Sequence, residues 1–303
     1  MKNPVAAAGA TLTLILVAIV VWVFLNPGFA KGQIEDYVQK ATGRTVEIKG
    51  GSSLMFRPQL SVRLTDVILS NPEGQDGALI KSAAIIVPIE WRDLLTRQLR
   101  IGTVTMKQPV FNVTNDAAGR ASWTDPAMPS SSEGRVLTLI AEEGVINYLN
   151  EKSGLAFVIK DADFQATLAG NDELAARGTA SINGRFVSFQ AYVKSLARAA
   201  SEGSPADFDL ESPGAKIGFS GRLASRDSLA LAGQLTISAD ETRDFAKWLS
   251  ATLPGSGSLG PLSLAAKLDS TNAVLSFADA DLSIGDNVLK GKLTIDATRA
   301  RPK

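Results

Sequence analysis

The sequence predicts a mainly β protein that follows an N-terminal transmembrane helix, and two features of the hydrophobic pattern carry this prediction. Residues 5–25 form one uncharged apolar run, whereas most of the rest of the 303-residue chain alternates apolar and polar residues over short stretches. Alternation with a period of two is typical of half-buried strands. A third feature, the absence of histidine and cysteine, limits the chemistry that such a protein could perform.

The apolar run VAAAGATLTLILVAIVVWVFL is long enough to cross a membrane as a helix. At about 1.5 Å per residue it spans roughly 30 Å, the thickness of bilayer hydrocarbon. A cleaved signal peptide would have a shorter apolar core, although Gly28-Phe29-Ala30 resembles a weak cleavage site. We therefore predict an uncleaved anchor over residues 1–27. Lys2 favours a single pass with a cytoplasmic N-terminus, which places residues 28–303 outside the cytoplasm.

A short amphipathic helix follows the anchor, and a series of strands follows that helix. Ile34, Tyr37, Val38 and Ala41 have helical spacing. The apolar residues that alternate in the later segments are Leu60, Val62 and Leu64; Ala83, Ile85, Val87 and Ile89; Val187, Phe189, Ala191 and Val193; Leu229, Leu231, Leu235 and Ile237; Leu262, Leu264 and Leu268; and Leu289, Leu293 and Ile295. Turn residues separate these runs, and Asn183-Gly184 is the clearest two-residue hairpin turn.

Two helical patterns and one loop interrupt the strands. One helix is predicted over residues 90–99, and a capping box at Ser238 to Glu241 predicts the start of another. Their apolar faces comprise Trp91, Leu94 and Leu95 in the first and Phe245, Trp248 and Leu249 in the second. Residues 125–134 are rich in Pro and Ser, so we expect a loop break there within one β-rich domain over residues 28–303.

The composition argues against most catalytic and nucleic-acid-binding functions. Without histidine or cysteine, the usual zinc and haem sites and the usual nucleophilic triads are not available. The formal net charge is zero, which does not favour nucleic-acid binding. Gly255–Gly260 match G-x-G-x-x-G, but they follow a helix and precede a strand, the reverse of a dinucleotide site, so we predict a flexible loop. We expect neither an enzyme nor a cofactor.

A D-A-D-apolar pattern occurs twice, at Asp161–Phe164 and at Asp279–Leu282. Spaced carboxylates could bind a hard cation, but an oxygen-ligand site usually needs more than two carboxylates. Acidic residues are also typical of strand bends and edges, where they keep a sheet soluble. We expect strand bends at both positions.

The alternating pattern leaves the shape of the β structure open. A closed core would bury the apolar face of the strands, whereas an open curved sheet would leave this face as an apolar trough. Periodicity alone does not separate these two arrangements.

Several motifs between the anchor and Trp123 resemble a known family. They are Thr42-Gly43-Arg44-Thr45-Val46, Gly50, Pro58, Leu60, Asp66–Pro72, Leu94-Leu95, Ile101, Val104, Pro109-Val110 and Gly119. In order and spacing they resemble the amino-terminal region of the AsmA family of inner-membrane-anchored, TamB-related periplasmic proteins. Gly144–Tyr148 and the segment around Trp248 resemble later parts of the family less sharply. Ser122 and Asn150 depart from the asparagine and aspartate that are usual there.

The resemblance implies an elongated, curved antiparallel β-sheet that forms an open groove, or taco, with a few short helices. It implies phospholipid transport toward the outer membrane and a role in outer-membrane biogenesis, as in bridge-like lipid transfer proteins. The implied partners are phospholipid acyl chains, the inner membrane and other envelope proteins. The competing function is an anchored periplasmic scaffold that assists outer-membrane protein assembly by strand addition at a sheet edge.

Within such a groove, the residues expected to face lipid come from five alternating segments. They are Ile85, Val87, Ile89, Val104, Met106, Phe157, Ile159, Val187, Phe189, Leu235 and Ile237. The alternative is that many of them fill a closed sandwich core.

Overall fold

The computed structural model describes residues 32, 35, 39, 44–72, 74–90, 102–122, 136–151, 154–224, 230–271 and 274–296. Gly32, Glu35 and Gln39 are helical, in agreement with the short helix predicted there. The predicted anchor (1–27), the predicted loop (125–134) and, apart from Glu90, the predicted helix over residues 90–99 lie outside the described residues. Within the described residues, no helix is both long and apolar enough to span a bilayer.

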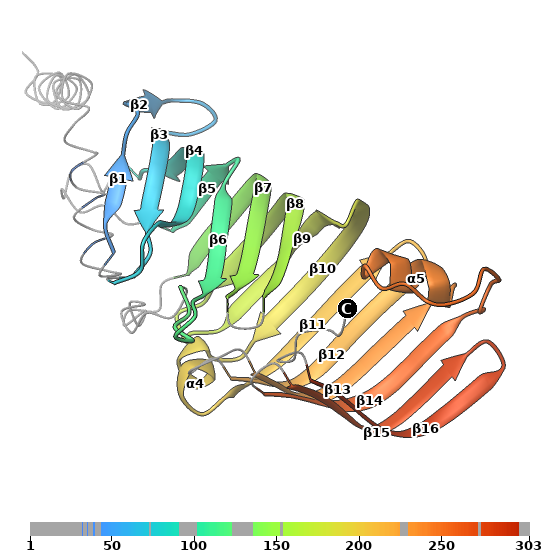
Figure 1. Cartoon of the computed structure of the whole chain (residues 1–303). Helices are drawn as coiled ribbons and strands as arrows, with labels where there is room; N and C mark the ends of the chain where they lie inside the picture. The colour runs from blue at the N-terminus through green and yellow to red at the C-terminus, as the bar shows by residue number, and fades with distance from the viewer. Residues whose placement is uncertain are drawn as a thin grey trace, which may run out of the picture.

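The described residues build one 16-stranded sheet that is strongly curved (Figure 1). Its first half comprises β1 (Val46–Ile48), β2 (Ser52–Met55), β3 (Ser61–Ser70), β4 (Ala78–Pro88), β5 (Thr103–Lys107), β6 (Val110–Asn115), β7 (Leu137–Asn150) and β8 (Leu155–Leu168). Its second half comprises β9 (Leu174–Ile182), β10 (Arg185–Val193), β11 (Ser204–Ser212), β12 (Ala215–Ala224), β13 (Ala230–Ala239), β14 (Leu262–Thr271), β15 (Val274–Ile284) and β16 (Asn287–Asp296).

From β7 onward the sheet grows by antiparallel pairing of each strand with the next one in the chain. The Asn183-Gly184 turn between β9 and β10 is confirmed, because both residues have positive φ (49° and 77°) and Ile182 pairs with Arg185. Before β7 the order is β1-β3-β4, and β5 and β6 both lie between β4 and β7. The main path of the sheet therefore runs from β1 to β16, while β2 pairs with β3 off this path.

The prediction of a wholly antiparallel sheet is wrong at one place, because β5 and β6 run parallel to β7. Thr103 aligns with Thr138, and Asn115 aligns with Asn150. Parallel neighbours need a crossover of about a dozen residues or more, and the connection from Asn115 to Leu137 is long enough. Alternation along a strand reports which face each residue occupies but not the direction of the neighbouring strand, so the sequence pattern did not reveal this crossover.

Several strands bend at residues in the left-handed region of backbone conformation. Asp161 in β8 and Asp279 in β15 have φ of 49° and 50°, and each lies within a register shift. They are the first aspartates of the repeated D-A-D pattern, so the predicted strand bends are confirmed. Gln108 and Glu143 also have positive φ (48° and 56°) and contact each other, the Gln108 amide donating to the Glu143 carboxylate at 2.9 Å. Glu143 also lies within a register shift, and a bulge of this kind bends the strand that carries it.

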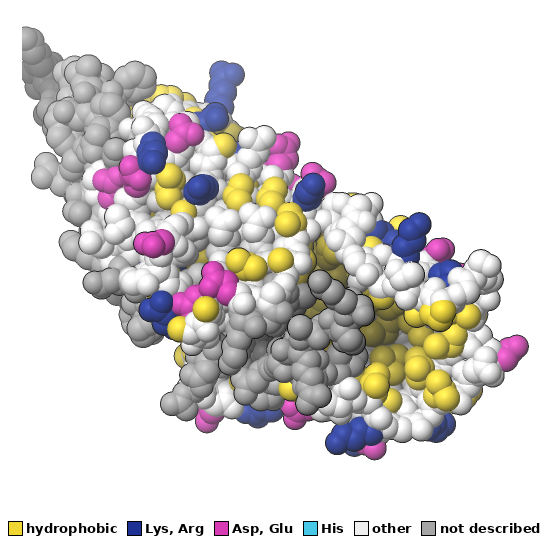
Figure 2. Space-filling model, in the orientation of Figure 1, with side chains coloured by type: hydrophobic (Ala, Val, Ile, Leu, Met, Phe, Trp, Pro, Cys, Tyr) yellow, Lys and Arg dark blue, Asp and Glu magenta, His cyan; other side chains and the backbone are white. Residues whose placement is uncertain are grey.

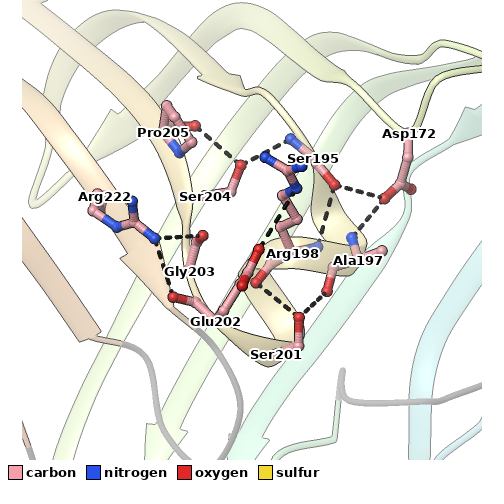
Figure 3. Close-up of polar contacts among 10 residues, drawn as sticks. All are labelled: Asp172, Ser195, Ala197, Arg198, Ser201, Glu202, Gly203, Ser204, Pro205 and Arg222. Carbon is pink, nitrogen blue, oxygen red and sulfur yellow. Dashed lines mark hydrogen bonds and ion pairs between the residues drawn. The ribbon is translucent and has the colours of Figure 1, made fainter.

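The helix α4 (Leu196–Ser201) connects β10 to β11 and is fixed to the sheet by polar contacts (Figure 3). The Ser195 hydroxyl caps it by accepting from the Arg198 backbone N–H at 3.2 Å. The Asp172 carboxylate accepts from the Ala197 backbone N–H at 2.5 Å and from the Ser195 hydroxyl at 3.3 Å. The sequence analysis did not predict this helix, whose local signal is limited to the serine cap.

The end of α4 is also held, by contacts to β11 and β12. Arg222 donates to the backbone carbonyls of Glu202 and Gly203 at 3.2 and 3.0 Å. On the inner side, Ala199 packs with Val193 and Ala206. This helix is therefore tied to strands on both sides.

The helix α5 (Thr242–Trp248) separates β13 from β14 in the chain and lies over the sheet (Figure 1). The helix is confirmed, and Phe245 and Trp248 are buried as predicted. The predicted capping box is wrong, because Ser238 remains in β13 and Glu241 is the N-cap residue. Leu249 is 51% exposed and does not belong to the buried face.

Candidate functional site

The sheet has one apolar and one polar face, and the strand register shows this residue by residue. Residues directly opposite one another on neighbouring strands share a face. One such row, which we call the central row, crosses every strand of the path from β3 to β16. It consists of Leu64, Ile85, Met106, Ala141, Phe164, Gly178, Phe189, Leu210, Ile217, Ile237, Leu264, Leu282 and Leu289.

The neighbouring row, one residue along each strand, lies on the opposite face and is mainly polar. It consists of Arg63, Ile86, Thr105, Ile140, Gln165, Arg177, Gln190, Asp209, Gly218, Thr236, Ala265, Asp281 and Lys290. From β8 onward this row contains no large apolar side chain. A sheet with one apolar and one polar face needs a cover for the first face or a ligand on it.

The apolar face forms a trough that runs across the strands. Figure 2 shows hydrophobic side chains gathered in a hollow over β12–β15, below α5. With neighbouring strands about 4.8 Å apart, the central row extends about 60 Å. One leaflet of bilayer hydrocarbon is about 15 Å thick, so the trough is several acyl-chain lengths long. We use the name trough for the central row and the positions two residues to either side of it.

Ten of the eleven residues that the sequence analysis selected lie on this apolar face. Ile85, Met106, Phe189 and Ile237 belong to the central row. Six others lie on the same face of their strands, two or more residues along the strand from the central row: Val87, Val104, Phe157, Ile159, Val187 and Leu235. Ile89 follows the end of β4 and packs against the same cluster as Ile85.

Their burial differs along the face. Val187 is fully buried, and Val87 and Met106 are 3% and 9% exposed, so these three pack within the protein. The other eight are half-buried or exposed, and Phe157 reaches 42% exposure. The apolar face is therefore packed in places and open in others, which combines the two arrangements that periodicity left undecided.

The structure adds trough residues that the sequence analysis did not select, and the clearest are Phe164 and Phe219. Phe164 follows the bulge at Asp161, which shifts the alternation of β8. The sequence pattern therefore did not indicate on which face Phe164 lies. Its ring lies 6.4 Å from that of Phe189, and Gly178 lies directly between these two residues in the register. A Cβ at Gly178 would be 2.3 Å from the Asp163 carbonyl oxygen, so glycine permits this close approach.

The helix α5 covers one part of the apolar face, next to the β9–β10 hairpin. Phe245 and Trp248 pack into a buried cluster that includes Val187. The Trp248 indole N–H donates to the Ile182 carbonyl oxygen at 2.7 Å. The Asn183 amide donates to the Trp248 carbonyl oxygen at 2.8 Å. This part of the trough is closed.

The loop that follows α5 contains the G-x-G-x-x-G match and is fixed, which differs from the flexible loop that we predicted. The Glu241 carboxylate accepts from the backbone N–H groups of Leu259 (2.8 Å) and Asp244 (2.9 Å), and these bonds lower the pKa of Glu241 to about 2. Arg243 donates to the carbonyl oxygens of Gly257, Leu253 and Pro254. The loop leads into β14, so it does not have the strand–loop–helix order of a nucleotide site.

The polar face also carries a depression, of about 710 Å³, across β7–β11. Its lining includes Glu142, Arg177, Gln190 and Glu211. Glu142 pairs with Lys107, and Glu211 pairs with Lys216 at 2.8 Å. Within the described residues, no group of three or more acidic side chains could hold a metal ion. Charged and polar side chains make up most of this lining, and Ile140, Phe164 and Phe189 also contribute to it. The depression is confined to β7–β11, whereas the central row crosses the sheet from β3 to β16, so the trough remains the better candidate site.

Comparison with known proteins places the chain in a family. No curated protein matches it significantly. The sequence profile of the AsmA family matches residues 1–166, which is more than half of the chain. The matched part reaches into β8 and so includes the first portion of the trough. The chain therefore belongs to the AsmA family.

Proposed function

We propose that this protein is a membrane-anchored periplasmic carrier whose trough conducts phospholipid acyl chains toward the outer membrane. The observation that carries this proposal is the central row, which places an apolar residue or glycine on the same face of every strand of the path from β3 to β16. Membership of the AsmA family supports a role in the cell envelope. The apolar run at residues 5–25 supports attachment to the inner membrane.

The mechanism that follows is physical rather than chemical. Moving a CH₂ group from water to an apolar surface is favourable by about 0.8 kcal/mol, so a free acyl chain needs continuous apolar cover. The trough can supply this cover for the chain, while the polar headgroup stays in water at the open side. No bond is made or broken. The protein acts by reducing the hydrocarbon surface that is exposed to water, which lowers the free-energy cost of moving the lipid.

Photo-crosslinking in living cells tests this proposal with matched positions. A benzophenone amino acid is placed at Phe189 or at Leu235 in the trough, and at the adjacent Gln190 or Gln234 on the polar face. Each pair differs by one residue along the same strand, so only the face changes. We expect phospholipid adducts, detected by mass spectrometry, at the two trough positions alone. Equal adducts on both faces, or none at the trough, would refute a lipid-carrying trough.

A second function, assistance of outer-membrane protein assembly by strand addition, is favoured by the last strand. No described strand pairs with the outer edge of β16. Val288, Leu289 and Leu293 on this strand are 59%, 59% and 54% exposed. Such an edge is a template for another strand. A photo-crosslinker at Lys292 would capture a protein if this function operates, and lipid adducts at Phe189 would then be missing.

A further inference from the structure

We propose that α5 and its following loop (residues 241–260, called the lid) can be displaced, and that the floor beneath the lid is a further binding site for a linear acyl chain. This inference rests on the proposed function, because it assigns a way of regulating the same trough. Its physical basis is that the lid and an acyl chain would occupy the same apolar surface.

The floor beneath the lid differs in side-chain size from the rest of the trough. The buried residues there include Ala162, Ala180, Ala215 and Ala239, none more than 5% exposed. Large apolar residues on both sides pack against the same cluster: Ile146, Ile159, Phe164, Ile182, Ile217, Ile237 and Leu262. The alanines therefore leave a depression within an otherwise bulky surface.

Two aromatic rings of the lid fill this depression. Phe245 and Trp248 are 6% and 5% exposed, and their ring centroids are 5.8 Å apart in an edge-on arrangement. Displacing them would expose a depression wide enough for two rings and continuous with the trough. Its apolar lining and elongated continuation fit a linear hydrocarbon rather than a polar ligand.

The lid is built as one unit with few polar links to the strands beneath it. Glu241 and Arg243 bond the helix to its own loop, as described above. The links to the β9–β10 hairpin are the two hydrogen bonds of Trp248 and the Arg185 guanidinium, which lies 5.2 Å from the centroid of the Trp248 ring. We call these three contacts the latch.

The lid ends at Gly260, just before the chain rejoins the sheet. Gly260 has φ of 78°, and a Cβ there would lie 3.0 Å from the Gly285 Cα. A glycine at such a junction can absorb a change in backbone angles. By contrast, α4 is bonded to the loop before β9 through Asp172 and to β12 through Arg222, so it serves as a fixed comparator. Breaking the latch should therefore free the lid while α4 stays in place.

Cysteine accessibility measures lid opening directly, because the chain contains no cysteine of its own. Ala180→Cys places the single thiol beneath the lid, and Ala206→Cys places it beneath α4 as the matched control. Asn183→Gly with Arg185→Ala removes two of the three latch contacts and keeps the bond from the Trp248 indole to the Ile182 carbonyl; glycine tolerates the positive φ of position 183. We call this variant the broken latch. Lys247→Ala, on the exposed side of α5, controls for the lost positive charge.

The experiment uses the full chain in an amphipol and a maleimide reagent, with or without vesicles of phosphatidylglycerol and phosphatidylethanolamine. We expect the broken latch to speed labelling at position 180 by roughly tenfold, because the variant loses one hydrogen bond and one cation–π contact. The vesicles should slow this labelling again, because acyl chains then cover the floor. Position 206 and the Lys247→Ala variant should show neither effect.

Three results would overturn the inference. Labelling at position 180 that the broken latch does not change would show that the lid is a fixed part of the fold. Faster labelling that the vesicles do not slow would show that the floor binds no acyl chain. In both cases lipid adducts at Phe189 would leave the proposed function standing. If those adducts are also missing, the proposed function fails and the inference fails with it.

Discussion

Replacing Leu235 by aspartate is expected to leave the protein folded, whereas replacing Val187 by aspartate is expected to unfold it. Both residues lie on the apolar face, but Leu235 is half-buried and Val187 has no exposed surface. A carboxylate at position 235 can turn toward the open trough and remain hydrated. A carboxylate at position 187 would be enclosed beneath α5 without a partner.

The burial of the two side chains sets the expected magnitudes. Leu235→Asp loses part of the leucine burial, which corresponds to about 1 kcal/mol. Val187→Asp loses the full burial of a valine, about 1.5 kcal/mol or more, and adds several kcal/mol for an unpaired buried charge. The sum is comparable to the total stability of a typical domain, about 5–15 kcal/mol. The two variants should therefore differ qualitatively.

Urea denaturation followed by circular dichroism measures this difference, with Gln234→Asp on the polar face as the control. We expect the control to change the unfolding free energy by less than about 0.5 kcal/mol. Leu235→Asp should also abolish lipid adducts at Phe189, because an acyl chain in the trough would remove water from the carboxylate, which is unfavourable. If Leu235→Asp destabilises the protein as much as Val187→Asp, the sheet encloses a core at this position and the trough argument is refuted.

Three further predictions concern the lid, the bulges and one glycine. The pKa of Glu241 falls from its usual 4.5 to about 2 on folding, so its contribution to stability is present above pH 4.5 and is lost as the pH falls toward 2. The protection factors of the lid amides, which compare the exchange rate with the intrinsic rate at each pH, should fall over this range, and Glu241→Gln should remove this pH dependence of protection. Asp161→Gly should keep β8 folded because φ is positive there, whereas Asp161→Val should cost about 1–2 kcal/mol in urea unfolding; equal stability of the two would contradict the bulge. Gly178→Ala should cost about 1–3 kcal/mol, because its Cβ would meet backbone atoms, and a neutral effect in the same assay would show that the strands can separate there.

The sequence by itself determined the class of the fold and part of its apolar face. Period-two alternation placed Ile85, Phe189 and Ile237 on an apolar face, and all three lie in the central row. It did so because a strand sends alternate side chains to opposite faces, whatever its neighbours are. The Asn183-Gly184 turn and the D-A-D bends were equally local, since both depend on residues that tolerate positive φ.

Only the tertiary structure decided how the strands combine and which parts of the apolar face are covered. The parallel pairing of β6 with β7 depends on a crossover, and the pattern within a strand carries no information about it. Val187 and Leu235 have the same alternation, yet α5 buries the first and leaves the second half-open. That difference arises from a contact between Trp248 and Ile182, distant in sequence, and long-range packing of this kind is not encoded in local periodicity.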